Sequence, residues 1–270
     1  MQYLFFIIIL LFTGCADDNF KKYSNLKDFR VLAIKADFPE VNDDNSAVSM
    51  TVLVSDISQE GRVVDLVVEA CLDPGVSSGE EISCAGAEKY QLVTTMSINM
   101  ATEFSGSVFT GVVSPIVVNI PGNILSDRNE LERFNGINYL VLFKFSHNGN
   151  KLLDSFKRIK VSTRLAKNSN PEIGDIGDIE FSQGERSLLV GVQSEPESFP
   201  FIDLTGASQI GKEIFYLSWF SSVGDIENPQ VLKGENTKIV FNKDLPSEAV
   251  VLVVLRDGRG GVDFKMKKLP

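Results

Sequence analysis

Short stretches of alternating apolar and polar residues, separated by turn residues, restrict the fold of this chain most strongly. Within 47–56, Val48, Met50, Val52 and Val54 share one face, with Ser49, Thr51 and Ser55 on the opposite face, which is the period of a half-buried β-strand. Stretches of similar character recur at 29–41, 63–72, 90–100, 108–120, 139–146 and 151–163. Asn, Asp, Gly and Pro, which favour turns, lie between many of them. This pattern predicts an all-β protein.

The second half of the chain continues the same pattern. Phe215, Leu217 and Trp219 fall on one face of a predicted strand, whereas 249–255 is apolar on both faces and should lie centrally in a sheet. The glycine-rich stretch 256–261 predicts a hairpin turn. We expect residues 197–212 to form a loop.

Three local signals make more specific predictions. Asn148-Gly149 predicts a tight hairpin between the strands on either side of it. Pro115 places the strand at 108–120 on a sheet edge, because proline cannot donate to a strand ladder. Residues 126–134 are the best helix candidate, with Ser126 as the expected N-cap and acidic residues in the first turn.

The N-terminus is typical of an exported protein. The apolar run from Tyr3 to Phe12 is shorter than the about 20 residues that span a bilayer as a helix, and it fits the apolar part of a signal peptide. Gly14 then precedes Cys15. Small residues directly before a cysteine resemble the lipobox of bacterial lipoproteins. The resemblance implies cleavage before Cys15 and acyl chains such as palmitate on its new N-terminus. The alternatives are an ordinary signal peptide with a free thiol, or an uncleaved anchor.

Two cysteines remain if Cys15 is lipidated. A pair of cysteines in an exported protein predicts a disulfide, here between Cys71 and Cys84. A metal site would need further ligands, and the one histidine, His147, is distant in sequence. We therefore expect no bound metal and no cofactor.

The charge of the chain limits its partners. It carries 26 Lys and Arg against 36 Asp and Glu, a net charge of −10. Nucleic-acid binding needs a basic surface, so no nucleic-acid partner is expected. The expected contacts are with the membrane through the N-terminal lipid, and with an unidentified envelope protein or glycan.

The strand pattern divides the chain into two folded regions. We expect a signal peptide at 1–14, a lipidated tether at 15–28, a first β-sandwich domain with insertions at 29–165, a connector at 166–183 and a second sandwich at 184–270. The opening RVLAIKADFPEV and the ending LSWFSSVGDI…VVLVVLRDGRGGVDF resemble bacterial Ig-like and polycystin-type repeats. This resemblance implies two Ig-like β-sandwich domains, in a family that is mostly uncharacterised.

Candidate chemistry along the chain is sparse. The stretch 75–79 matches G-x-S-x-G, but a nucleophile elbow lies between a strand and a helix, and no helix follows here. Asp43, Asp44, Asp257 and Asp263 lie in turns, where backbone hydrogen bonding explains aspartate better than calcium binding does. Trp219 is expected in the core rather than on a sugar-binding surface.

These observations predict a lipid-anchored protein of the bacterial cell envelope, most simply of the outer membrane, with a non-catalytic structural or partner-binding role and no enzymatic activity. The alternative is a module that binds glycan or peptidoglycan, with or without calcium. An envelope hydrolase is the third hypothesis. It would require a cleft with converging acidic residues.

Overall fold

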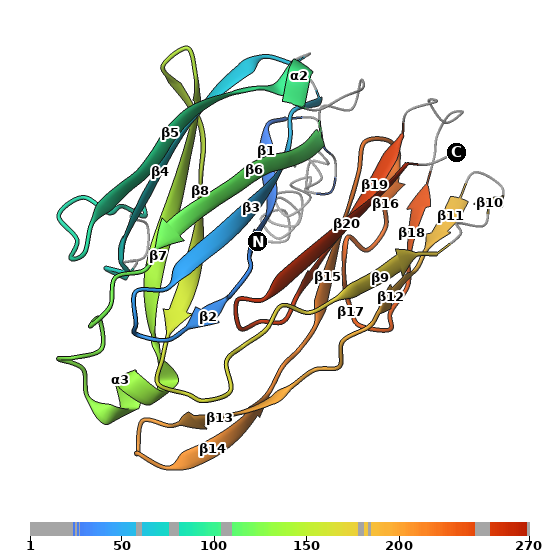
Figure 1. The fold of residues 1–270 in the computed structure, drawn as a ribbon. Helices are drawn as coiled ribbons and strands as arrows, with labels where there is room; N and C mark the ends of the chain where they lie inside the picture. Colours follow the sequence, from blue (N-terminus) through green and yellow to red (C-terminus); the bar gives the residue numbers. More distant parts are fainter. Residues whose placement is uncertain are drawn as a thin grey trace, which may run out of the picture.

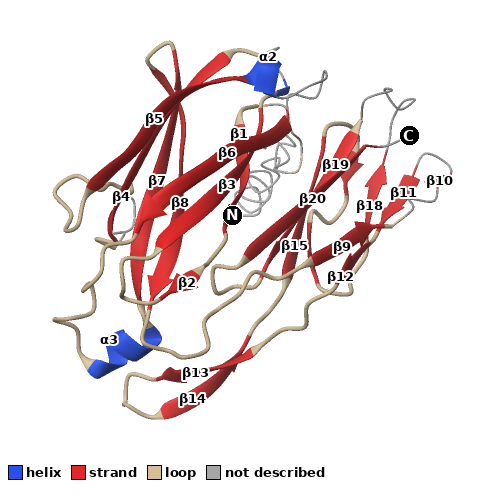
Figure 2. Cartoon of the chain, in the orientation of Figure 1, coloured by secondary structure: helices blue, strands red, loops and turns tan. Residues whose placement is uncertain are grey.

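The computed structural model describes Ser24, Leu26 and residues 28–57, 61–75, 81–103, 110–177, 181–182, 185–240 and 249–268. In these residues the regular structure is almost entirely β, with two short helices, α2 (Met100–Glu103) and α3 (Glu130–Asn135) (Figure 2). None of the helices in this part of the chain is both long enough and apolar enough to cross a membrane. The signal sequence and Cys15 lie outside the described residues.

The first region contains two sheets that face each other (Figure 1). One has the order β1-β3-β6, from β1 (Arg30–Ala36), β3 (Ala47–Ser55) and β6 (Thr110–Asn119). The other has the order β2-β8-β7-β4-β5, from β2 (Glu40–Val41), β8 (Asn150–Val161), β7 (Ile137–His147), β4 (Val63–Leu72) and β5 (Gln91–Asn99). The β2–β8 pair is parallel, and the other pairs are antiparallel.

Alternation along the strands builds the core between these two sheets. Val48, Met50, Val52 and Val54 of β3 are fully buried there, as the period of two predicted. They pack with residues of the opposite sheet such as Phe143, which is also fully buried. The first region is therefore a β-sandwich with one continuous core.

The second region has a four-stranded sheet of order β17-β15-β19-β20, from β17 (Gln230–Leu232), β15 (Tyr216–Ser221), β19 (Val250–Arg256) and β20 (Val262–Lys268). A second sheet has the order β10-β11-β18-β16, from β10 (Phe181–Ser182), β11 (Glu185–Leu188), β18 (Thr237–Val240) and β16 (Asp225–Ile226). A pair is formed by β12 (Val190–Val192) and β9 (Ile173–Ile176). Trp219, Val253 and Ile239 pack between these layers, which makes this region a second sandwich.

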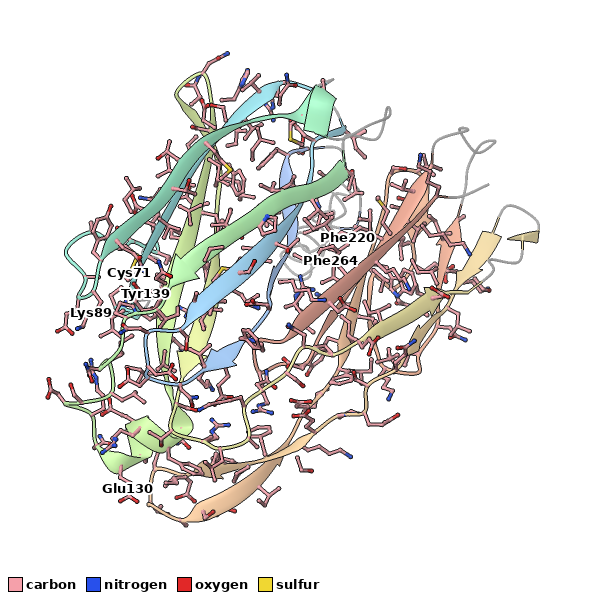
Figure 3. All side chains as sticks on the ribbon, in the orientation of Figure 1. Cys71, Lys89, Glu130, Tyr139, Phe220 and Phe264 are labelled. Carbon is pink, nitrogen blue, oxygen red and sulfur yellow. A yellow bond between two sulfur atoms is a disulfide. The ribbon has the colours of Figure 1, made fainter. Side chains whose placement is uncertain are left out.

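A third apolar cluster lies between the two sandwiches. It joins Leu32 and Leu53 of the first region to Leu252 of the second. Phe220 and Phe264 extend from the second region toward the first in the same zone (Figure 3). This contact explains why β19 is buried on both faces, and why Leu53 is buried although it points away from the first core.

The structure corrects three of the sequence-based expectations. Helix α3 begins at Glu130 with Asn129 as its N-cap, not with Ser126, because Asn129 and Glu132 form a reciprocal capping box. Residues 197–212, expected as a loop, form the hairpin of β13 (Ser198–Ile202) and β14 (Ser208–Lys212). The expected connector contains strand β9, whose Ile173 and Ile176 belong to the second core.

Other predictions are confirmed. The hairpin between β7 and β8 turns through Asn148 and Gly149, both with positive φ, which is the backbone that a tight Asn-Gly turn requires. Pro115 lies on β6, at the edge of its sheet. Strand β19 is central in its sheet, as the doubly apolar sequence predicted.

Candidate functional site: the junction between the two sandwiches

The predicted disulfide forms at the edge of the first sandwich. Cys71, at the end of β4, is bonded to Cys84, and both are fully buried against Leu140. Figure 3 shows Cys71 near Tyr139 and Lys89. The Tyr139 hydroxyl donates a hydrogen bond to the Lys89 carbonyl oxygen, 2.9 Å away, and burial raises its pKa. The disulfide fixes the chain that follows β4. Ser77 of the G-x-S-x-G match lies outside the described residues.

A cluster of buried charge lies where the two sandwiches meet. We call it the junction cluster, and it consists of Glu40, Arg164, Asn168, Glu213, Asp257 and Arg259. Glu40 comes from β2 in the first region, and Arg259 comes from the β19–β20 turn in the second. Arg164 and Asn168 lie between them in sequence. The cluster therefore joins both regions to the chain that connects them.

Glu40 is the centre of the junction cluster. Its side chain is 1% exposed. It accepts hydrogen bonds from the Ser162 hydroxyl at 2.5 Å and from the backbone N–H of Asn168 at 3.0 Å. The Arg164 guanidinium lies 3.8 Å from one carboxylate oxygen and the Arg259 guanidinium 3.5 Å from the other. A buried carboxylate is stable only when it is paired and hydrogen-bonded in this way.

Arg259 links Glu40 to the β13–β14 hairpin. Its guanidinium donates to Glu213 at 2.8 Å and lies 4.2 Å from the centre of the Phe199 ring on β13. Burial raises the pKa of the Glu213 carboxyl, and hydrogen bonds from the Glu197 amide and Arg259 oppose this shift only in part. Arg259 thus holds the base of the hairpin against the second sandwich and against Glu40 together.

Arg164 fastens helix α3 to the same cluster. Its guanidinium donates to the carbonyl oxygens of Phe134, at 3.0 Å, and Asn135, at 2.7 Å, which lie at the C-terminal end of α3. A cation at this position satisfies carbonyl groups that have no partner within the helix. The Asn135 side chain in turn makes two hydrogen bonds with the backbone of Ile202 on β13.

The turn aspartates act as backbone acceptors. Asp257 accepts from the amides of Arg259 and Gly261, at 2.7 and 2.9 Å, and from the Asn168 side chain at 2.8 Å. Asp43 likewise accepts from the amides of Ile124 and Leu125. This geometry matches the turn role predicted from the sequence.

Asp44 and Asp263 also have partners. Asp44 accepts from the Ser46 hydroxyl at 2.7 Å, and Asp263 pairs with Lys35 at 2.7 Å. Within the described part of the chain, no group of three or more His, Cys, Asp or Glu residues has the arrangement of a metal site.

His147 and Trp219 are both held by local structure. Nδ1 of His147 lies 2.6 Å from the Val63 carbonyl oxygen, and Nε2 lies 3.0 Å from the Asn148 side chain. The first contact ties the β7–β8 hairpin to the start of β4, and the second lies within the hairpin turn. Trp219 is 1% exposed and packs with Phe215 in the second core. Its indole is not available as a platform for a sugar ring.

Sequence reasoning missed the junction cluster. Its residues are far apart in the chain: Glu40 and Arg259 are 219 positions apart, and Glu40 and Asn168 are 128 apart. No motif spacing brings such residues together. The available signal was weak: charged residues adjoin predicted strand ends, where a second folded region can cover them.

Comparisons with known proteins give structural likeness only. No protein-family model matches the chain, and no curated protein matches it. The FN1–FN3 domains of chicken CNTN1 align at 10% identity over 91% of this chain and 69% of that one, with a TM-score of 0.24. The tandem V-type regions of VCBP3, a v-region-containing chitin binding protein, align at 8% identity over 89% of this chain and 99% of that one, with a TM-score of 0.28. Red sea bream transglutaminase aligns at 9% identity over 91% and 32%, with a TM-score of 0.26.

At these identities and scores, the likeness says nothing about activity or ligands. What the site can do therefore follows from its own geometry. The acidic oxygens of the junction cluster already receive bonds from guanidinium, amide and hydroxyl donors. The arrangement is suited to holding two sandwiches together.

Proposed function

We propose that this chain is a lipid-anchored protein of the bacterial cell envelope with a non-catalytic role. Acyl chains on Cys15 attach it to the membrane, most simply the outer membrane. The two sandwiches act as one stiff unit that presents a binding surface at a fixed distance from the lipid.

The junction cluster is the observation that supports a single stiff unit of two sandwiches. A flexible pair of domains needs only a polar, solvated contact between its parts. Here Glu40 and Arg259 come from different sandwiches and meet below the surface, and an apolar cluster lies beside them. Separating the sandwiches would expose these charges without partners and would uncover apolar surface, and both effects oppose bending.

The two ends of strand β15 support a directional arrangement. Ser24 and Leu26 lie within the expected tether 15–28, but both are buried and exchange backbone hydrogen bonds with Ser221 at the end of β15. The β13–β14 hairpin directly precedes Tyr216 at the start of the same strand. Figure 1 accordingly places this hairpin and α3 at the end of the molecule away from the start of β1. The tether and the hairpin would thus lie at opposite ends.

Exposed apolar side chains at the hairpin end favour partner binding over a purely structural role. Leu204 in the hairpin turn is 97% exposed, Ile210 on β14 is 71% exposed, and Leu165 next to Arg164 is 102% exposed. Single exposed apolar residues are common. Three of them near one end of the chain, each more than 70% exposed, support an interaction surface there.

Intact-mass analysis of protein extracted from membranes tests the anchoring. We expect a species that begins at Cys15 and carries the mass of acyl chains. A Cys15→Ala variant should lose the acyl mass and leave the membrane fraction. An uncut N-terminus or an unmodified Cys15 in the membrane-extracted protein would refute the proposal.

A further inference from the structure

A groove runs along the seam between the two sandwiches. It has a volume of about 220 Å³ and is lined by residues 31–34 of β1, residues 155–157 of β8, Arg256 at the end of β19, and Val262 of β20. Both regions contribute to it. It is separate from the junction cluster, none of whose residues lines it.

The lining of the groove contains two cations and no acidic residue. Lys157 is 7% exposed, and its ammonium donates to the backbone carbonyl oxygen of Gly260. No carboxylate in the described part of the chain forms an ion pair with it. Burial lowers the pKa of Lys157 to about 8; the nearby Asp257 opposes this shift and Arg256 adds to it. The positive charge of this side chain is thus incompletely compensated.

Three charged groups on elements that adjoin Lys157 already have partners. Lys35 of β1 is paired with Asp263 of β20 at 2.7 Å. Arg158, the next residue on β8, is paired with Asp73 at 2.6 Å. Asp257 accepts from two backbone amides and from the Asn168 side chain. Rearranging any of these carboxylates toward Lys157 would leave another group without its partner.

Arg256 is fixed in place beside this lysine. Its guanidinium donates to the Ser218 hydroxyl at 3.0 Å and to the Leu32 carbonyl oxygen at 2.9 Å. These bonds bridge β19, β15 and β1, so the guanidinium does not have to be ordered when an anion arrives. A cation held in advance in this way binds at a lower entropic cost than a mobile one.

The rest of the lining is largely apolar. Leu32, Ile34 and Val262 are buried, and Phe156 is 40% exposed. Typical pockets for drug-sized ligands have volumes of about 300–1,000 Å³, so this groove suits a smaller molecule. We propose that it binds a small organic carboxylate, with the carboxylate between Lys157 and Arg256 and a short alkyl chain against the apolar side chains.

Saturation-transfer difference NMR with n-butyrate tests the proposal on the full chain in detergent. At pH 7 we expect saturable butyrate binding, weaker binding of acetate, and still weaker binding of inorganic phosphate. Affinity should fall above pH 8, by up to tenfold per pH unit, because the protonated form of Lys157 is the one that binds. The absence of any signal up to about 50 mM butyrate, a flat pH profile, or a preference for phosphate would overturn the proposal.

A matched pair of variants assigns the site. Lys157→Met keeps the length and apolar character of the side chain but removes the charge, and it should weaken butyrate binding at least tenfold. Lys151→Met removes a charge from the same strand at a position that does not line the groove, and it should change binding less than twofold. Equal binding by both variants would refute the assignment. If Lys157→Met does not fold, the pH profile and chain-length series of the unaltered protein decide.

Discussion

Removing the charge of Glu40 should weaken the whole molecule. The change Glu40→Gln keeps the shape of the side chain and one acceptor oxygen, but removes its attraction to Arg164 and Arg259, 3.8 and 3.5 Å away. At an effective dielectric constant of about 20, one unit-charge pair at such distances is worth roughly 4–5 kcal/mol. The gain from no longer burying a carboxylate offsets part of this. We expect a net loss of about 3 kcal/mol, the lower end of the range for breaking a buried pair.

Urea unfolding of the full chain in detergent measures this loss. Trp219 is the one tryptophan in the sequence and reports on the second core, whereas far-UV circular dichroism reports on both sandwiches. In the unaltered protein the two signals should change together. As a control, Glu81→Gln removes a pair with Lys151 whose side chains are 85% and 52% exposed, and it should leave the urea midpoint nearly unchanged. If Glu40→Gln costs less than about 1 kcal/mol, the junction cluster does not hold the sandwiches together.

Three further predictions concern single sites. Replacing Cys71 and Cys84 by alanine should cost about 3 kcal/mol of unfolding free energy by the chain-entropy estimate, and both thiols should resist labelling without reductant in the unaltered protein. Gly261→Ala should lower the melting temperature clearly, because its Cβ would lie 2.7 Å from a facing backbone carbonyl oxygen; an unchanged melting temperature would contradict the packing. Hydrogen bonds, first that from the Thr205 hydroxyl, lower the pKa of Asp203 to about 2. Its stabilising contribution is therefore present above about pH 4 and is lost as the pH falls through about 2. Thr205→Val should raise this pKa in a carbon-13 NMR titration, and no change would contradict the assignment.

Local patterns predicted most strands of this fold. Val63–Leu72 has the bounds that its alternating sequence suggested. The Asn148-Gly149 turn and the doubly apolar β19 were also readable, because each depends on backbone or side-chain preferences within a few residues. The β13–β14 hairpin could not be predicted in this way, because it contains Pro200, and a proline counts against a strand. In the structure, β13 tolerates Pro200 because β14 is the one strand that pairs with β13 within the described residues.

The contacts between the two sandwiches were beyond sequence reasoning. Ser55 belongs to the polar side of the alternating β3 sequence, yet it is fully buried and bonded to Thr110 of β6 in the same sandwich. Leu53 is buried because the second sandwich covers that face of the strand. Periodicity reports which face of a strand is apolar. It does not report which surface later covers the other face.

A distance measurement across the junction tests the central claim most directly. If Cys15 is acylated and Cys71 is bonded to Cys84, cysteines introduced at the exposed positions Thr95 on β5 and Gln230 on β17 would be the free thiols for spin labels. Pulsed electron paramagnetic resonance should then give one distance distribution, as narrow as that of a label pair within the first sandwich. A broad or multiple distribution in the unaltered background would contradict a stiff two-sandwich unit.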